Sequence, residues 1–357
     1  MVQSASQNHS TLSAPLLFLP SLLFECVVRA RNGLYDTSLF SQASLPHPVV
    51  SIGNLTVGGS GKTPLVVLVA QTAGRLGATP ALLSRGYGRS EKVAVVLPPG
   101  TEVPTPERLV GDEPALMRRH EPRLWLGISH DRRSVARQIA GRAERLVYIL
   151  DDGFQHRRLK RDLDIVVIDR TQPLAGNRLL PGGTLREPPS GLRRAGIIVI
   201  NGSLDSRPDD PLEKLVRSLN RQAAVFHCQQ RIERLAPFYD WQESGPAANP
   251  CRAPGAVYLV AAIGNPGRFR SDIQFLGIDV RGERFFRDHA RLSRTDWREC
   301  ARKAAGVGAA ALITTEKDAI KITDPLDFPL LVAVQSTRLA EQAVFEQQLK
   351  ELVGGGR

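Results

Sequence analysis

SIGNLTVGGSGKTP, residues 51–64, is the stretch that decides the fold of this chain. An apolar run, HPVVSIG (47–53), leads into it, and the apolar segment KTPLVVLVAQTAGRLG (62–77) follows. The first has the composition of a strand and the second has the pattern of a helix. A strand, a glycine-rich turn and a helix in this order are the context in which such a turn binds phosphate. We therefore predict a phosphate-binding loop.

The loop departs at one position from the strict pattern G-x-x-x-x-G-K-[ST], because Thr56 stands where the pattern has glycine. Three nearby glycines keep the backbone free to turn its N–H groups toward phosphate oxygens, and the amino terminus of the helix adds positive potential. Lys62 is expected to reach the β- and γ-phosphates, and Thr63 to bind Mg²⁺. A plain glycine turn at a strand end is the alternative. The expected nucleotide-binding residues are Thr56, Val57, Gly58, Gly59, Ser60, Gly61, Lys62 and Thr63.

Acidic residues after other strands are candidate magnesium ligands. The run RLVYIL (145–150) leads directly into Asp151 and Asp152. A carboxylate at the end of a strand beside the phosphate loop is the usual holder of Mg²⁺ in this kind of site. Asp169 also ends an expected strand, so a single acid after a strand is a weak indicator of a metal site. The doubled acid followed by GFQH is more specific.

The GDEP stretch (111–114) adds two more carboxylates. Asp112 and Glu113 are either the cap and first turn of a helix, or a base for a hydroxyl together with a metal-side acid. Spacing alone leaves both roles open. His289, beside Asp288 in FFRDHARLS, is likewise either a site residue or a solvated loop histidine.

Two arginine-bearing turns are candidates for binding anionic oxygens. SRGYGR (84–89) contains Arg85 and Arg89, and LLPGGTLREP (179–188) contains Arg186. An arginine can hold a phosphate or carboxylate with two parallel hydrogen bonds. Both stretches are also compatible with ordinary surface turns.

Apolar runs alternate with helix-like segments along most of the chain, which predicts parallel sheets covered on both faces. The first set of expected strands is 47–53, 80–84, 122–128, 145–150, 164–169 and 196–200, with helices at 63–76, 113–120 and 131–143. The second set is 256–263, 275–280, 310–315 and 329–334, with helices near 267–276, 294–306 and 338–352. We therefore expect an α/β protein: a P-loop NTPase-like α/β/α domain with a parallel sheet, plus a second, smaller α/β domain.

Polar, proline-bearing stretches divide these two sets. They are DSRPDDP (205–211) and WQESGPAANPCRAPG (241–255). The expected organisation is an amino-terminal membrane-associating helix (1–35), the P-loop domain (36–225), which the resemblance given below makes a kinase domain, a linker region (226–255) and the smaller α/β domain (256–357).

The bulk composition limits the class of partner. A formal net charge of +11 favours an acidic partner: nucleic acid, an anionic membrane or a phosphorylated substrate. Aromatic residues make up only 6% and do not alternate with basic ones, so we do not expect nucleic acid. The four cysteines form no C-x-x-C pair, which argues against a disulfide scaffold or a thiolate zinc site and fits a reducing compartment.

The amino-terminal segment APLLFLPSLLFECVV (14–28) is apolar but shorter than the roughly 20 residues of a spanning helix. No Lys or Arg precedes it within the first ten residues, so a secretory signal lacks its basic region. Leu22, Leu23, Cys26 and Val27 fall on one helical face, and Arg29 and Arg31 follow. A helix lying in an anionic membrane surface and a helix packed on the domain core both fit this pattern.

Together, these pieces resemble the family of tetraacyldisaccharide 4'-kinases, the lipid A 4'-kinases of Gram-negative bacteria. DDGFQHR followed by LLPGG-LREP is the most specific part of the resemblance, whereas GDEP or GKT alone is weak. The matching pieces, in the family's order, are RARNGLYD (29–36), IGNLTVGGSGKTP (52–64), LSRGYGR (83–89), GDEP (111–114), LDDGFQHRRLKRDLDIVVID (150–169), LLPGGTLREP (179–188), AAIGNPGRF (261–269), FFRDH (285–289) and TTEKDAIK (314–321).

The resemblance implies an activity, its cofactors and a place in the cell. The activity is transfer of the γ-phosphoryl group of ATP, with Mg²⁺, to the 4'-hydroxyl of a tetraacylated glucosamine disaccharide 1-phosphate, which gives lipid IVA. The place is the cytoplasmic face of the inner membrane, with peripheral or monotopic attachment through the amino-terminal helix.

The resemblance also implies roles for individual residues. Asp112 matches the general base and His289 the histidine that orients it, and both are expected to be catalytic together with Lys62. Ala290 stands where the family often has a second histidine or a glutamine, so any role of that neighbour is absent here. The implied metal ligands are Thr63, Glu113, Asp151 and Asp152. The implied substrate-binding residues are Arg85, Gln155, Arg186 and, on a looser match, Arg132.

Two other classes of protein remain alternatives at this point. A P-loop GTPase or ATPase switch, or a metallochaperone-type protein, would use the same loop without a lipid substrate. The chain contains no [NT]-K-x-D guanine-binding motif, which counts against a GTPase. A membrane adaptor that binds anionic lipid without consuming ATP is the other alternative.

Overall fold

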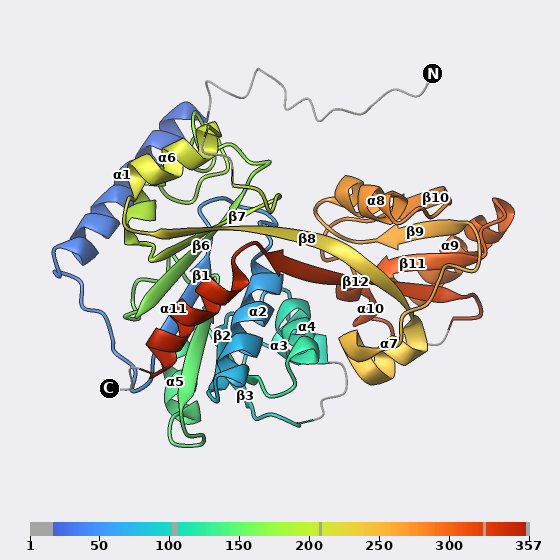
Figure 1. Ribbon diagram of the computed structural model, residues 1–357, viewed down its shortest axis with the longest axis horizontal. Coiled ribbons are helices and arrows are strands. Elements are labelled where there is room, and N and C mark those ends of the chain that lie inside the picture. The colour runs from blue at the N-terminus through green and yellow to red at the C-terminus, as the bar shows by residue number, and fades with distance from the viewer. Residues whose placement is uncertain (1–16, 102–105, 207–208, 324–325, 355–357) are drawn as a thin grey trace.

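The computed structural model describes residues 17–101, 106–206, 209–323 and 326–354. Within these ranges, twelve strands form one continuous sheet in the order β10-β9-β11-β12-β8-β7-β6-β1-β5-β2-β4-β3 (Figure 1). The strands are β1 (Val49–Gly53), β2 (Thr79–Ser84), β3 (Val95–Leu97), β4 (Trp125–Ile128), β5 (Leu146–Asp151), β6 (Leu163–Asp169), β7 (Ile197–Asn201), β8 (Ala224–Pro237), β9 (Val257–Ala261), β10 (Val280–Phe285), β11 (Ala311–Thr315) and β12 (Leu330–Leu339).

The α-helices of the described residues connect these strands and cover the sheet. They are α1 (Phe18–Asp36), α2 (Lys62–Arg75), α3 (Pro106–Val110), α4 (Asp112–His120), α5 (Arg132–Ile139), α6 (Pro211–Leu219), α7 (Phe238–Ser244), α8 (Pro266–Phe275), α9 (Arg294–Gly306), α10 (Glu316–Ala319) and α11 (Gln342–Gly354).

The first part of the sheet, from β7 to β4, is parallel throughout and buried on both faces. Successive residues of β1 point to opposite faces, so Val50 packs with α2 whereas Val49 packs with α5. Because both faces are covered, the strands read as continuous apolar runs rather than as alternating ones. This three-layer arrangement confirms the predicted P-loop NTPase-like α/β fold.

The second part is smaller and repeats the same construction. Strands β9, β11 and β12 are parallel, with β10 at the outer edge. Helix α9 covers one face, where Trp297 is buried, and α8 covers the other, where Phe269 is buried. The predicted second α/β unit is therefore present in the fold.

A long strand, β8, joins the two parts. It pairs in parallel with β7 over Ala224–Cys228 and antiparallel with β12 over Cys228–Pro237, so no break interrupts the sheet (Figure 1). The region expected as a linker (226–255) thus contains most of a strand and the helix α7. Helix α11 lies within the range assigned to the smaller domain, yet its Phe345 and Leu349 are buried in the core cluster around α2. The boundaries between domains remain a prediction.

One expected strand is displaced. Residues 275–280 were expected to form a strand, but α8 continues to Phe275 and a turn with Gly277 at a φ of 75° follows. The strand β10 begins only at Val280 and carries Arg281, Glu283 and Arg284. An edge strand tolerates such polar residues because one of its sides has no partner strand. The apolar run at 275–280 therefore indicated the wrong residues for this strand.

Candidate active site

The candidate site lies at the edge where parallel strands of the first part end. Strand β1 runs into the glycine-rich loop, β5 ends at Asp151 and β2 ends at Ser84. The register Ile52↔Asp151 and Leu83↔Leu150 brings the ends of these three strands together. Crevices at the carboxyl ends of parallel strands are where α/β proteins bind ligands.

The glycine-rich loop has the conformation that a phosphate cradle requires. Helix α2 begins at Lys62, directly after Gly61, whose φ is 86°. A Cβ atom on Gly61 would lie only 2.4 Å from Nε2 of Gln230, so a side chain there would meet both strain and a clash. Gln230 donates a hydrogen bond to the carbonyl oxygen of Gly61 at 2.7 Å, and Asn201 donates one to that of Ser60 at 3.2 Å. The loop is thus held from β8 and β7, with the amino terminus of α2 at its end.

Thr56 occupies a buried position that ties this loop to the LLPGGTLREP loop. Its backbone pairs with that of Leu185 in an isolated antiparallel bridge. The N–H of Val57 donates to the carbonyl oxygen of Thr184 at 2.8 Å. The departure from the strict pattern therefore falls in a short β-like pairing, where a threonine is favoured over glycine.

Lys62, Asp152 and Arg186 form a charged group beside the loop. The ammonium of Lys62 lies 3.1 Å from Oδ1 of Asn54 and 3.4 Å from Oδ1 of Asp152. Nη1 of Arg186 lies 2.7 Å from Oδ2 of Asp152. Asp152 has a positive φ of 48°, a conformation that costs energy in a residue with a side chain and that recurs at functional sites. Burial raises the pKa of Asp152, but the charges of Lys62 and Arg186 outweigh it and hold the pKa below its ordinary value.

Asp151 is buried next to this group, and its pKa is shifted in the opposite direction to that of Asp152. Ser84 donates a hydrogen bond to its Oδ2 at 2.9 Å. Burial, together with the negative charges of Glu113 and Asp152, raises the pKa of Asp151 to about 6. A cation beside Asp151 would relieve the repulsion that this buried carboxylate experiences from its two acidic neighbours.

These carboxylates fit a magnesium ion held partly by nucleotide phosphates. In the described part of the chain, no three His, Cys, Asp or Glu side chains are grouped closely enough to hold a metal by themselves. Mg²⁺ is commonly bound through only one or two carboxylates plus substrate phosphates. The negative field around Asp151 and the position of Asp152 beside the phosphate loop are the observations that fit such an ion.

The four predicted substrate residues lie around the same group but differ in what they contact. Arg85 is exposed, and Arg186 is partly exposed while it bonds to Asp152. Arg132 is only 2% exposed, and its Nη2 donates to the carbonyl oxygen of Asp151 at 3.0 Å. Gln155 donates from Nε2 to the carbonyl oxygen of Asn54 and to Glu187, both at 2.8 Å. Arg132 and Gln155 thus bond to protein groups and hold the loops that carry Asp151 and Lys62.

Burial of Arg132 and the neighbouring charge of Arg85 lower the pKa of Arg132 to about 10. Its Nε and Nη1 atoms are buried and have no hydrogen-bond partner within the described residues. The predicted assignment of this arginine to substrate stays a prediction.

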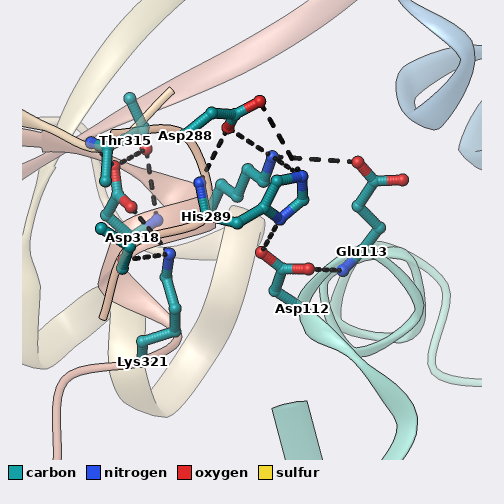
Figure 2. A network of polar contacts seen from close by, with 10 residues as sticks. Asp112, Glu113, Asp288, His289, Thr315, Asp318 and Lys321 are labelled. Atoms are coloured by element: carbon teal, nitrogen blue, oxygen red, sulfur yellow. Dashed lines mark hydrogen bonds and ion pairs between the residues drawn. The ribbon is translucent and has the colours of Figure 1, made fainter. Parts of the chain in front are cut away.

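Asp112 and His289 come together from the two parts of the fold. Oδ2 of Asp112 lies 2.9 Å from Nδ1 of His289, although 177 residues separate them in the chain (Figure 2). Asp112 is the first residue of α4, and its Oδ1 accepts a hydrogen bond from the N–H of Glu113 at 3.1 Å. His289 has a positive φ of 62°. The sequence left Asp112 as either a cap or a base, and the structure pairs it with the predicted histidine.

This pairing keeps Asp112 ionised. Burial raises the pKa of Asp112, but the hydrogen bond with His289 and the charge of Lys317 lower it more, so the net pKa is below its ordinary value. The hydrogen bond to Asp112 raises the pKa of His289, against the opposing effects of burial and of Lys317. At neutral pH the carboxylate is therefore available to accept a proton.

Comparison with known proteins shows the family of this chain. The model of the tetraacyldisaccharide-1-P 4'-kinase family matches residues 13–354. The chain belongs to this family. It is 38% identical to the tetraacyldisaccharide 4'-kinase of Anaeromyxobacter sp. over 321 residues, which cover 89% of this chain and 85% of that relative. It is 34% identical to the 4'-kinase of Syntrophus aciditrophicus, over 96% of this chain and 94% of the relative.

A solved structure of the family has the same fold. The crystal structure of LpxK from Aquifex aeolicus in complex with ATP superposes with a TM-score of 0.73 at 27% identity. The match covers 95% of this chain and 99% of the other. The 4'-kinase fold therefore extends over both parts of the sheet in this chain.

Sequence reasoning missed several residues of this 4'-kinase site. Lys317 lies 3.1 Å from Nε2 of His289, and the ring of Tyr87 stacks edge-on against His289 at 5.5 Å between centroids. Asn54 accepts the hydrogen bond from Lys62. All three belong to stretches that matched the family, but nothing in their local sequence indicates a role, because each acts through a partner distant in the chain.

Proposed function

We propose that this chain transfers the γ-phosphoryl group of ATP to the 4'-hydroxyl of a tetraacylated glucosamine disaccharide 1-phosphate, with lipid IVA as product. One observation carries the proposal: Asp112, paired with His289, follows Gly111, which packs against the turn after β2 at the sheet edge that carries the phosphate loop and Lys62. A base for a hydroxyl and a cradle for the nucleotide are the two parts that a sugar kinase needs. The relatives that the chain matches are named tetraacyldisaccharide 4'-kinases.

In this mechanism the sugar oxygen forms a bond to the γ-phosphorus as the bond to the β,γ-bridging oxygen breaks and ADP leaves. The transition state is loose, so the hydroxyl proton moves late and a carboxylate suffices to accept it. Asp112 takes that proton on the carboxylate that His289 orients. Lys62 and the backbone N–H groups at the start of α2 stabilise charge on the phosphate oxygens.

Mg²⁺ is the second cofactor that we propose. Thr63, Glu113, Asp151 and Asp152 are the residues that would hold it, and it would neutralise charge on the β- and γ-phosphates. Asp152 is the strongest candidate among them, because its carboxylate also lies next to Lys62 and Arg186.

Replacing Asp152 by asparagine is expected to raise the Mg²⁺ concentration needed for half-maximal activity by at least about 10-fold, because a charged ligand becomes neutral. The measurement is initial rate against free Mg²⁺ at fixed ATP. Asp169→Asn is the matched control, since Asp169 also ends an apolar strand but its carboxylate accepts hydrogen bonds from Thr171 in its own turn. An unchanged Mg²⁺ dependence in Asp152→Asn would remove Asp152 from the metal site.

The amino-terminal helix α1 supports attachment to an anionic membrane surface. Leu19, Leu22, Leu23 and Val27 are 72%, 47%, 68% and 59% exposed along it, while Val28 is buried against the core. A helix with one buried and one exposed apolar face has the form of an interfacial helix. No helix in the described ranges has the length and apolar character to cross a bilayer. Residues 1–16 of the predicted membrane-associating segment lie outside the described residues.

Contacts of α1 connect this proposed membrane surface to the active site. Ser21 accepts a hydrogen bond from the N–H of Gly182 at 2.7 Å, and Asn32 donates one to Glu187 at 3.2 Å, both within or next to the loop that carries Arg186. Arg31 donates to the carbonyl oxygen of Gln155 at 2.8 Å, so it faces the protein rather than lipid headgroups. A lipid held against α1 would lie beside the loops with the candidate substrate residues. We place the protein on the cytoplasmic face of the inner membrane.

The double variant Leu19→Asp, Leu23→Asp is expected to lose most of its binding to anionic vesicles, because two charges replace the most exposed leucines of α1. The measurement is sedimentation with phosphatidylglycerol-containing vesicles. Val344→Asp is the control, since Val344 is 52% exposed but lies on α11. Equal vesicle binding by both variants would argue against α1 as the membrane contact.

The direct test of function is incubation with γ-labelled ATP and the disaccharide 1-phosphate, followed by thin-layer chromatography. A labelled, more polar glycolipid is the expected product. Competition with unlabelled GTP separates this function from a nucleotide switch. A preference for GTP, or no transfer to the lipid, would reject the kinase assignment.

A further inference from the structure

Lys317 reaches the Asp112–His289 pair from the second part of the fold. It is the second residue of α10, and its side chain is 19% exposed. Its ammonium lies 3.1 Å from Nε2 of His289, 3.2 Å from Oδ1 of Asp288 and 3.9 Å from Oε1 of Glu113. It therefore contacts Nε2 of the imidazole, whereas Asp112 contacts Nδ1.

The hydrogen-bonding groups leave one consistent arrangement. An ammonium only donates, and an ionised carboxylate only accepts. Nε2 of His289 must then present its lone pair to Lys317, and Nδ1 must carry the proton and donate it to Asp112. In the neutral form of the ring, the single N–H therefore points at the proposed base.

Without Lys317, two carboxylates would compete for that ring. Oδ2 of Asp288 lies 3.9 Å from Nε2 of His289, on the side opposite to Asp112. A ring between two carboxylates can donate from either nitrogen, or from both as an imidazolium. Lys317 bonds to Asp288 and to Nε2 of His289 at once. It thereby prevents Nε2 from donating a proton to Asp288.

The backbone around Lys317 is held independently of its side chain. Glu316 is buried and accepts hydrogen bonds from Trp241 at 3.0 Å and from the N–H of Gln335 at 3.1 Å, and it lies 3.1 Å from His120 at the end of α4. Asp318 accepts hydrogen bonds from Thr315 and from the N–H of Ala262 (Figure 2 shows Asp318 and Thr315). The ammonium of Lys317 is thus presented from a fixed turn that also contacts the helix carrying Asp112.

We propose that Lys317 is a positioning residue for the phosphoryl transfer, which reserves the single ring proton of His289 for Asp112. The inference rests on the proposed function, because Asp112 must be the base for this ring proton to matter. Lys317 acts through its contact with Nε2 of His289. Its loss leaves substrate binding intact and misorients the base.

The test compares Lys317→Met, which removes the donors, with Lys317→Arg, which keeps a charged donor without an acceptor. We expect kcat to fall about 100-fold in Lys317→Met, with the KM values for ATP and disaccharide within about 3-fold, because a small misplacement of a catalytic group costs about that much. Lys317→Arg is expected to recover most of the loss. Lys303→Met is the control and should match the wild type, since Lys303 is exposed on α9 and pairs with Glu299.

The second measurement is the ring nitrogen spectrum of ¹⁵N-histidine-labelled protein, with His289 assigned by comparison with His289→Gln. At a pH where the ring is neutral, Nδ1 of the wild type is expected to be protonated and Nε2 unprotonated, whereas in Lys317→Met Nε2 gains proton occupancy. This readout needs no substrate. Circular dichroism monitors whether Lys317→Met is folded. If Lys317 had a purely structural role, the protonation pattern of the His289 ring would be unchanged in the folded variant.

The outcomes separate this inference from the proposed function. A wild type that does not phosphorylate the disaccharide rejects the function. An active wild type with Lys317→Met at wild-type kcat, or with the same ring pattern in both proteins, rejects the role of Lys317 alone. A raised KM for the disaccharide with kcat preserved would make Lys317 a substrate-binding residue and would equally overturn the inference.

Discussion

Lys62→Ala is expected to reduce kcat for phosphoryl transfer by about 100- to 1,000-fold, the loss that follows removal of one preorganised charge-stabilising donor. The physical reason is the position of its ammonium at the start of α2, between Asn54 and Asp152, next to the phosphate loop. Backbone N–H groups of the loop remain in place, so binding of ATP should weaken much less than turnover. The measurement is a steady-state assay with labelled ATP.

Two controls make the Lys62 result interpretable. Lys160→Ala removes a lysine from an exposed loop position and is expected to leave turnover unchanged. Thermal unfolding of Lys62→Ala in the absence of nucleotide should stay close to the wild type, because Asp152 keeps its bond to Arg186. Near-normal turnover in Lys62→Ala would mean that this loop is not the phosphate cradle.

Much of the fold could be predicted because parallel strands buried on both faces must be apolar along their length. Strands such as β5 and β7 have no exposed residue, so their sequences are continuous apolar runs that predict buried strands. Strand β8 could not be found in this way. Its middle reads HCQQRIER, and its buried and exposed residues alternate around the junction of the two parts. A strand that is half solvated and pairs with segments distant in the chain carries no continuous hydrophobic signal.

The C-terminal helix shows a second limit. Its pattern predicts a helix near 338–352, and α11 is found at Gln342–Gly354. The pattern says nothing of which core it joins. Arg75 of α2 pairs with Glu346 of α11 at 2.5 Å, and Phe226 of β8 stacks edge-on against Phe345. The destination of an amphipathic helix is decided by these tertiary contacts, which a single sequence does not display.

In the site, candidate residues could be proposed from the sequence where a short stretch carries the chemistry, and their roles stay predictions. The loop from Thr56 to Thr63 and the doubled acid at Asp151 are of this kind. Gln155 was expected to contact substrate, yet its amide bonds to Asn54 and Glu187. Lys317 was not singled out at all, because an isolated lysine after a strand is usually solvated and gains meaning only from His289 beside it. Spatial partners, rather than motifs, decide such roles.

Asp112→Ala is expected to lower kcat by about 100- to 10,000-fold, the range for loss of a general base, while ATP affinity changes little. Asp112 contacts His289 and the N–H of Glu113 and is bonded to no group of the phosphate loop. Its removal therefore takes away the proton acceptor without altering the nucleotide cradle. The measurements are kcat from initial rates and the affinity for ATP from equilibrium binding.

Asp112→Asn separates charge from shape in the same position. Asparagine keeps the size of the side chain and can still accept the hydrogen bond from His289, but it is not basic, so its kcat should be as low as that of Asp112→Ala. If the carboxylate of Asp112 served only to position His289, the Asp112→Asn variant would instead remain largely active. Because the pKa of Asp112 lies below its ordinary value, wild-type kcat should not fall from protonation of this group until the pH drops below about 4. Collapse of ATP affinity with kcat spared would make Asp112 a binding residue instead of the base.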